Sequence, residues 1–159
     1  MMDQNVVHDR FMIILEWLMS LQERHPASLQ FGLVHICFHN PRVLGEAYGA
    51  RDAAQMLTDL LARLRHAFRK TDLAIREGVD FWVLVPYTNP DTVTSKVREI
   101  VDMASASGLD IVERDIAVFS FPEFQAGQEQ THASPEDFLQ FLKRNRHIAF
   151  RWGSALPPR

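Results

Sequence analysis

The stretch DLAIREGVDFWVLVP, residues 72–86, decides the fold. It consists of two short runs of apolar and β-favouring residues on either side of Glu77-Gly78. Glycine supplies the backbone freedom that a tight turn needs. The pattern therefore predicts a β-hairpin. The elements before and after it in the sequence can be assigned relative to this hairpin.

Three further elements are predicted upstream of this hairpin. Apolar residues at helical spacing over residues 11–21 indicate a helix that ends before Pro26, because proline disfavours helical geometry in its predecessor. Residues 29–38 have the dense apolar composition that is typical of a strand buried on both faces. Between residues 53 and 68 apolar residues recur every three or four positions, which predicts an amphipathic helix.

Downstream, helices and strands continue to alternate. A helix is expected to start at Asn89-Pro90-Asp91 and to stop at Gly108, and residues 114–121 form a strand. After a polar stretch that is expected to be an exposed loop, Ser134-Pro135 supplies the cap and first position of a short helix. Residues 147–152 can form a last edge strand.

The order of these elements predicts an α/β (α+β) fold with a mixed central sheet of about five strands, covered by helices on both faces. The length of 159 residues and the apolar share of 47% suit one domain with a sizeable core. We expect an N-terminal helix leading into the domain over residues 1–28, the domain itself over 29–152, and a flexible tail over 153–159.

Bulk properties exclude several classes of protein. The formal charge of −3 gives no global attraction to nucleic acid or to an anionic membrane. One cysteine cannot form an internal disulfide, and the N-terminus carries no secretory signal. The longest apolar runs are interrupted by charge well before the roughly 20 residues that a membrane-spanning helix needs. A cytoplasmic protein without membrane insertion and without a nucleic-acid partner is expected.

Several strings resemble the GGDEF family. Residues 69–88, RKTDLAIREGVDFWVLVPYT, resemble the pattern R-x-x-D-x-x-x-R-Y-G-G-D-E-F followed by apolar residues and P-x-T, with one residue missing in the turn. Residues 115–123 resemble S-I-G-V-A-x-F-P-E, and residues 143–146 resemble the end of K-x-x-G-R-N-R. The resemblance implies a degenerate GGDEF domain of the diguanylate cyclase or nucleotidyl-cyclase type, from bacterial cyclic-di-GMP signalling, whose hairpin carries the degenerate signature.

The same resemblance implies that the catalytic positions have changed. The pattern D-x-D-x-F-K-x-x-N-D-x-x-G-H-x-x-G-D lies over residues 37–54 without a gap. Cys37 and His39 then replace the two aspartates, of which the first holds catalytic magnesium in the family. Gly45 and Ala54 replace the asparagine and aspartate that hydrogen-bond the guanine base.

The signature itself keeps one acidic residue. In the stretch Gly78-Val79-Asp80, Asp80 matches either the third or the fourth acidic position. Magnesium strongly prefers oxygen ligands, usually carboxylates, and a thiol is a poor substitute. We therefore predict that diguanylate cyclase activity is lost, that the chain has no catalytic residue, and that it uses no cofactor.

A ligand site remains, by the same resemblance, in the R-x-x-D motif just before the hairpin. Arg69 and Asp72 keep both diagnostic positions of the family's product-binding site for cyclic-di-GMP. Arginine can hold a guanine edge or a phosphate, and aspartate can accept from guanine. Arg98 lies one position from where a helping arginine is expected, and Glu99 occupies that spot. The alternative is that Arg69 and Asp72 only cap and solvate a helix end.

Two functions from different classes follow. The first is a non-catalytic cyclic-di-GMP receptor, and the second is a decayed domain that serves as an interaction or dimerisation scaffold. A partner protein, a fused signalling domain or a homodimer would suit either. An enzyme of altered chemistry is a third and weaker hypothesis.

The weaker hypothesis rests on His35, Cys37 and His39, which alternate along one predicted strand and therefore share a face. Imidazole and thiolate bind zinc or copper, but three residues on a straight strand splay apart. A buried cysteine with hydrogen-bonded histidines is favoured over a metal site. A second group, formed by aromatic residues in the hairpin and near the end of the strand predicted over residues 114–121, suggests a partner surface but is more typical of a core, with Trp82 expected to be partly exposed. Its members are Phe81, Trp82, Phe121 and Phe124.

Overall fold

The structure is a computed structural model that describes residues 4–25, 30–40, 42–68, 72–86, 90–106, 108–109, 114–121, 134–146 and 150–152. Arg69, the expected loop before Ser134 and the expected C-terminal tail lie outside the described residues. Among the described residues, no helix combines the length and the apolar content needed to cross a membrane.

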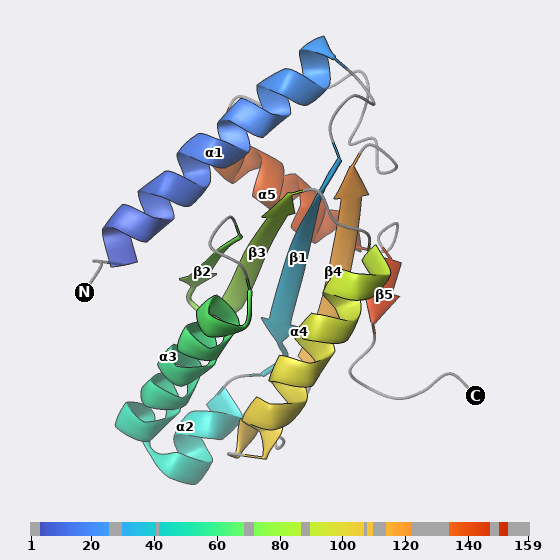
Figure 1. Ribbon diagram of the computed structural model, residues 1–159. Coiled ribbons are helices and arrows are strands. Elements are labelled where there is room, and N and C mark those ends of the chain that lie inside the picture. The colour runs from blue at the N-terminus through green and yellow to red at the C-terminus, as the bar shows by residue number, and fades with distance from the viewer. Residues whose placement is uncertain are drawn as a thin grey trace.

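A five-stranded sheet in the order β2-β3-β1-β4-β5 forms the centre of the molecule (Figure 1). Its strands are β1 (Phe31–Phe38), β2 (Leu73–Glu77), β3 (Asp80–Pro86), β4 (Arg114–Phe121) and β5 (Phe150–Trp152). The expected sheet of about five strands is therefore confirmed. All four neighbouring pairs are antiparallel, which corrects the expected mixture of parallel and antiparallel pairs.

The correction has a topological reason. Strands β1 and β2, which are joined through α2 and α3, run in the same direction, but β3 lies between them in the sheet. Likewise β3 and β4 run in the same direction, and β1 lies between them. These two helical connections thus join parallel strands that are not neighbours, while the connection through α5 joins β4 and β5, which are antiparallel neighbours. The alternation of helices and strands therefore produced no parallel ladder among the described strands.

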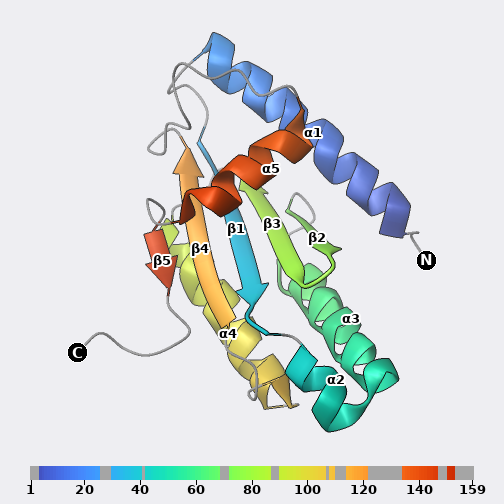
Figure 2. The same ribbon diagram turned by 180° about the vertical axis from the view of Figure 1, so that it is seen from behind.

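Within the described ranges, five helices cover the two faces of the sheet, and coverage of both faces was expected. One face carries α1 (Gln4–Arg24) and α5 (Pro135–Arg144) (Figure 2). The other face carries α2 (Arg42–Tyr48), α3 (Ala50–Ala67) and α4 (Pro90–Ser105) (Figure 1). Helix α2 was not predicted, because its seven residues are too few to show a helical period and only Leu44 among them is buried.

Two hydrophobic cores result, one on each face of the sheet. Along β1, Leu33 packs with the core beneath α1 and α5, while Val34 and Ile36 pack with the core beneath α2, α3 and α4. This alternation explains why the strand reads as a continuous apolar run. Trp82 is only 1% exposed within the α1–α5 core, so the expectation that it is partly exposed is wrong.

Local signals at turns and caps are confirmed. Gly78 has φ of +66° in the turn between β2 and β3, a conformation that glycine adopts without strain. The Ser134 Oγ accepts a hydrogen bond of 3.1 Å from the backbone N–H of Asp137, which caps α5. The first helix starts earlier than residue 11, at Gln4, because Val7 also packs into the core.

Candidate functional site

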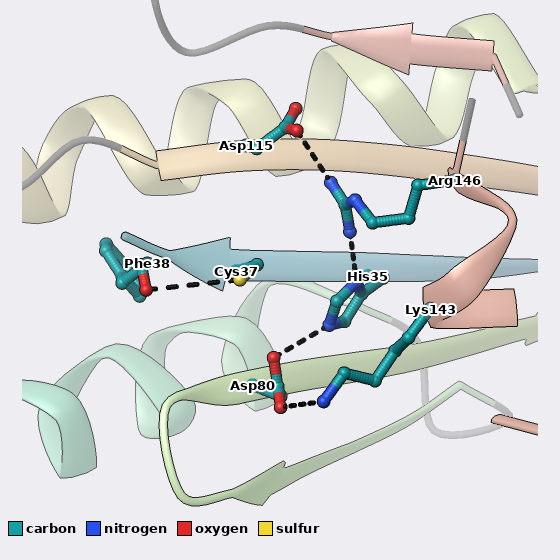
Figure 3. Close-up of polar contacts among 7 residues, drawn as sticks. All are labelled: His35, Cys37, Phe38, Asp80, Asp115, Lys143 and Arg146. Carbon is teal, nitrogen blue, oxygen red and sulfur yellow. Dashed lines mark hydrogen bonds and ion pairs between the residues drawn. The ribbon is translucent and has the colours of Figure 1, made fainter. Parts of the chain in front are cut away.

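A network of polar side chains lies at the end of β1, on the sheet face that α5 covers (Figure 3). Four elements or their ends contribute to it: His35 from β1, Asp80 from β3, Asp115 from β4, and Lys143 and Arg146 from α5 and the residues after it. Sheet register assembles the strand residues. Cys37 stands opposite both Asp80 and Asp115, and side chains directly opposite in a sheet point to the same face.

His35 is the centre of the network. Its side chain is 1% exposed, and its ring stacks on Trp82 with the centroids 4.3 Å apart. Nε2 lies 2.9 Å from the Asp80 Oδ1, and Nδ1 contacts the guanidinium of Arg146. A guanidinium can only donate, so Nδ1 must accept, and Nε2 carries the proton that it donates to Asp80. Burial lowers the pKa of His35, which favours this neutral tautomer.

Asp80 is held as a carboxylate by two donors. Its Oδ2 accepts a hydrogen bond of 2.7 Å from the Lys143 Nζ, in addition to the bond from His35. Burial raises the pKa of this carboxyl, but the hydrogen bonds from His35 and Lys143 outweigh burial and bring the pKa to about 2. The single acidic residue of the hairpin signature is therefore fully engaged with protein cations and donors.

The network is neutral as a whole. Arg146 forms an ion pair with Asp115, with an N–O distance of 3.2 Å, at the opposite end from Lys143. The carboxylates of Asp80 and Asp115 carry two negative charges, and Lys143 and Arg146 carry two positive charges. With His35 neutral, no charge is left over for a bound cation to balance. Truncating one member of such a buried pair is costly, because the remaining charge loses its partner.

A transition metal does not fit this arrangement. The ligand atoms of His35, Cys37 and Asp80 lie within 4.8 Å of one another, which is the spacing of a metal cluster. A metal-bound histidine donates its other ring N–H to an acceptor. Here that nitrogen faces the donor Arg146. Burial also raises the pKa of the Cys37 thiol, whereas metal binding requires the thiolate.

Magnesium, which the fold family implies, does not fit either. Magnesium takes oxygen ligands in near-octahedral geometry and needs carboxylates that are free to bind it. Asp80 is bound by Lys143, and Asp115 is bound by Arg146. The group opposite both carboxylates is the Cys37 thiol.

The structure separates the three residues predicted to share a strand face. His35 and Cys37 lie together, but β1 ends at Phe38, and His39 is an exposed residue beyond the strand. The positive φ of +50° at Asn40 turns the chain away. Asp80 joins the cluster in place of His39.

Sequence reasoning assigned no role to Lys143, Arg146 or Asp115. The first two lie in the KRNR string, which entered only as part of the family resemblance. The sequence signal for Asp115 is its charge inside a strand that is otherwise mostly apolar. Their partners lie far away in the chain, so only the fold brings them together: Lys143 and Asp80 are 63 residues apart, and His35 and Arg146 are 111 residues apart.

The remaining predicted site residues lie elsewhere. Gly45 is in α2, Ala54 is on the exposed side of α3, and Gly78-Val79 form the hairpin turn. Asp72 directly precedes β2. Arg98 is exposed on α4 and forms an ion pair of 3.8 Å with Asp102.

No family model matches the chain, and no curated protein matches it. Solved structures do match. A microbial GGDEF domain whose interaction mode with cyclic di-GMP was determined has a TM-score of 0.61 at 12% identity, over 84% of this chain and 79% of that chain. The GGDEF domain of TpbB, or YfiN, from Pseudomonas aeruginosa has a TM-score of 0.59 at 20% identity, over 86% and 81%.

A third match is the GGDEF domain of DgcB from Caulobacter crescentus in complex with c-di-GMP. Its TM-score is 0.54 at 10% identity, over 84% of this chain and 81% of that chain. Identities at this level show shared architecture, while function has to be argued from the site. The fold of this chain is therefore that of the GGDEF domains.

Proposed function

We propose that this chain is a non-catalytic GGDEF-like signalling module of the bacterial cytoplasm that binds cyclic-di-GMP through Arg69 and Asp72, with help from Arg98. The single observation that carries the non-catalytic half is the neutral network around His35. The receptor half rests on the R-x-x-D string before β2 and on the fold.

The case against catalysis is electrostatic. Forming a phosphodiester bond from GTP requires divalent cations that bridge phosphates and absorb developing charge. A cation at Asp80 would have to displace the Lys143 ammonium, 2.7 Å away, and break the hydrogen bond from His35. The thiol of Cys37 offers no compensating carboxylate. Diguanylate cyclase activity is therefore absent in this proposal, and no cofactor is used.

The case for a receptor is chemical. The guanidinium can donate to a guanine edge or to a phosphate, and the carboxylate three residues later can accept from the N–H groups of guanine. Asp72 directly precedes β2, and Arg98 lies exposed on α4. Of the GGDEF domains of similar architecture, one was studied for its interaction with cyclic di-GMP and another was solved in complex with c-di-GMP. These points support the same ligand for this chain.

Isothermal titration calorimetry with cyclic-di-GMP, with GTP as the comparison, tests the receptor. We expect heat of binding for cyclic-di-GMP and its loss in Arg69→Ala and in Asp72→Ala. Arg63→Ala is a matched control, because Arg63 is an exposed arginine on α3 outside the motif. Unchanged affinity in both motif variants, or no binding by the parent protein, would remove the receptor assignment.

The second candidate function is a scaffold or dimerisation module without nucleotide binding. The observation that favours it is a row of exposed apolar side chains on α1, at Val6, Ile13 and Trp17. A diguanylate cyclase of similar fold, SiaD from Pseudomonas aeruginosa, was solved in complex with its activator SiaC, and this chain covers 55% of that chain. Such a module is expected to bind a partner protein or a second copy of this chain.

A further inference from the structure

Large apolar side chains are exposed on the outer side of helix α1. Val6, Ile13 and Trp17 are 47%, 67% and 60% exposed, whereas Phe11 on the inner side is fully buried. They are three of the five large hydrophobic side chains that are exposed among the described residues. Exposed apolar residues that are scattered singly are normal, but apolar residues that gather on one surface mark a binding site for another molecule.

These residues belong to one line along the helix, which we call the α1 stripe: Val6, Arg10, Ile13, Trp17, Ser20 and Arg24. At about 100° per residue, all six fall within a sector of roughly 80°. Their spacing alternates between four and three residues, which is the spacing of a seam between two helices. Helix α1 lies along the outer edge of the molecule, and its inner side contacts β2 and α5, so the stripe faces away from the domain (Figure 1).

The two flanks of the α1 stripe differ in charge and burial. One flank carries Asp9, Glu16 and Glu23, which are all exposed and lie seven residues apart. The other flank is turned toward the core and consists of apolar residues that pack there: Val7, Ile14 and Leu21. Charged residues on the flanks of a two-helix seam select the partner helix and its orientation. On α1, this selection falls to the acidic flank.

An antiparallel second copy of this chain does not satisfy the acidic flank. In an antiparallel pair of identical helices, equivalent flanks face each other. Glu16 would lie near Glu16 of the second copy, and Asp9 would lie near Glu23 of the second copy. Like charges that face each other are destabilising. The acidic flank therefore disfavours this pairing.

A parallel second copy does not satisfy the flank either. In a parallel pair, each flank faces the opposite flank of the other helix. The three carboxylates would face Ile14 and Leu21, which offer them no cation. Arg10 and Arg24 in the stripe would each face their own copy. The acidic flank is satisfied only by a helix of different sequence that carries a row of cations.

We propose that the α1 stripe binds an amphipathic helix of a different protein, whose apolar seam is flanked by lysine or arginine residues at intervals of seven. Ile13 and Trp17 contact the apolar seam of this helix, and the acidic flank pairs with its cations. An apolar centre with a charged rim is the composition of protein interfaces, and tryptophan is enriched among the residues that dominate their affinity. The same acidic flank disfavours an anionic membrane surface. The inference rests on the scaffold candidate, names the chemistry of its partner, and does not depend on nucleotide binding.

Two synthetic helical peptides, each as long as α1 at 21 residues, test the proposal. Both carry leucine along the seam, and one carries lysine on both flanks while the other carries glutamate, so that neither peptide pairs with itself. In fluorescence anisotropy at low salt, the parent protein should bind the lysine peptide at least about ten times more tightly, since three positions change from attraction to repulsion. The preference should shrink at about 1 M salt, which screens exposed charges. Equal affinity for the two peptides at low salt, or no binding of the lysine peptide, overturns the proposal.

A substitution in the stripe tests where the peptide binds. Trp17→Ser should weaken binding of the lysine peptide at least about tenfold, because tryptophan at the centre of an interface carries much of the affinity. Met103→Ser is the matched control, since Met103 is 46% exposed on α4 and should leave binding unchanged. Circular dichroism checks that both variants fold. Equal binding by Trp17→Ser and the parent protein contradicts the assignment to the stripe.

Charge reversal tests the acidic flank. The double variant Glu16→Lys, Glu23→Lys should bind the glutamate peptide more tightly than the lysine peptide. The double variant Glu46→Lys, Glu99→Lys makes the same change in net charge at exposed positions on α2 and α4, and should keep the parent preference. A preference that reverses equally in both double variants shows attraction by net charge alone and overturns the proposal.

Light scattering after gel filtration distinguishes this partner from a second copy of the chain. Trp17→Ser should leave the molar mass of the parent protein unchanged. A parent dimer that Trp17→Ser dissociates shows that a second copy occupies the stripe, which overturns the proposal. If the parent protein binds neither peptide but forms a dimer that Trp17→Ser leaves intact, this inference fails while the scaffold candidate stands. Calorimetry with cyclic-di-GMP keeps the receptor proposal separate, since Trp17→Ser should bind this nucleotide as the parent protein does.

Discussion

Removing the charge of Asp80 is the sharpest test of the network. In Asp80→Asn the side chain keeps its shape but no longer balances Lys143, which lies 2.7 Å away. The Asp80 side chain is 16% exposed, so solvent screens this pair only in part. The fall of its pKa from 3.8 to about 2 corresponds to about 2 kcal/mol of stability at neutral pH. We expect Asp80→Asn to lower the free energy of unfolding by about that amount.

The effect has a defined pH dependence. The pKa of Asp80 is lower in the folded protein than in the unfolded chain, so its contribution is fully present above pH 3.8. It is lost as pH falls toward about 2, where the folded protein also binds the proton. The stability difference between the parent protein and Asp80→Asn should therefore be largest near pH 7 and should shrink below pH 3.8.

Urea unfolding followed by tryptophan fluorescence measures this difference, because Trp82 stacks on His35 within the network. Asp102→Asn is the matched control. Asp102 also pairs with two arginines, but its side chain is 58% exposed, and exposed ion pairs contribute little, about 0–1 kcal/mol. Equal loss of stability in Asp80→Asn and Asp102→Asn, or a loss that does not shrink in acid, would refute the reasoning.

Three further predictions concern single residues. Gly108→Ala should lower the free energy of unfolding in urea, because φ at Gly108 is +111° and an added Cβ would lie 2.9 Å from the Met56 Cε. Gly45→Ala is the control: its added Cβ would meet nothing within 4 Å in α2, so this variant should be neutral or more stable by up to about 1 kcal/mol. Burial lowers the pKa of His35, so the parent protein should lose stability as pH falls from 7.5 to 5.5, and His35→Gln should reduce that loss. Burial raises the pKa of Cys37, so at pH 8 its thiol should react with a disulfide reagent at least about ten times more slowly in the folded protein than in urea.

Local sequence signals predicted most of the fold. The hairpin was marked by Gly78, the cap of α5 by Ser134, and the strand predicted over residues 114–121 is observed as β4 (Arg114–Phe121). Each of these features is decided by residues close together in the chain. The antiparallel direction of the sheet pairs is not decided locally. It depends on β3 lying between β1 and β2, and on β1 lying between β3 and β4.

The site was predictable only in part. The alternation of His35 and Cys37 placed them on one face, but their true neighbours come from β3 and α5. Trp82 was expected to be partly exposed because its surroundings could not be inferred from the hairpin sequence. In the structure Trp82 lies opposite His35 in the sheet, and its indole ring stacks against the imidazole ring of His35.

The central claim is that the residues at the end of β1 balance one another's charge and leave no carboxylate for magnesium. The most direct measurement is incubation of the purified chain with GTP and magnesium, followed by chromatography of the nucleotides. The account predicts no cyclic-di-GMP above a buffer control, at any magnesium concentration. Cyclic-di-GMP that accumulates in proportion to the amount of protein would contradict it.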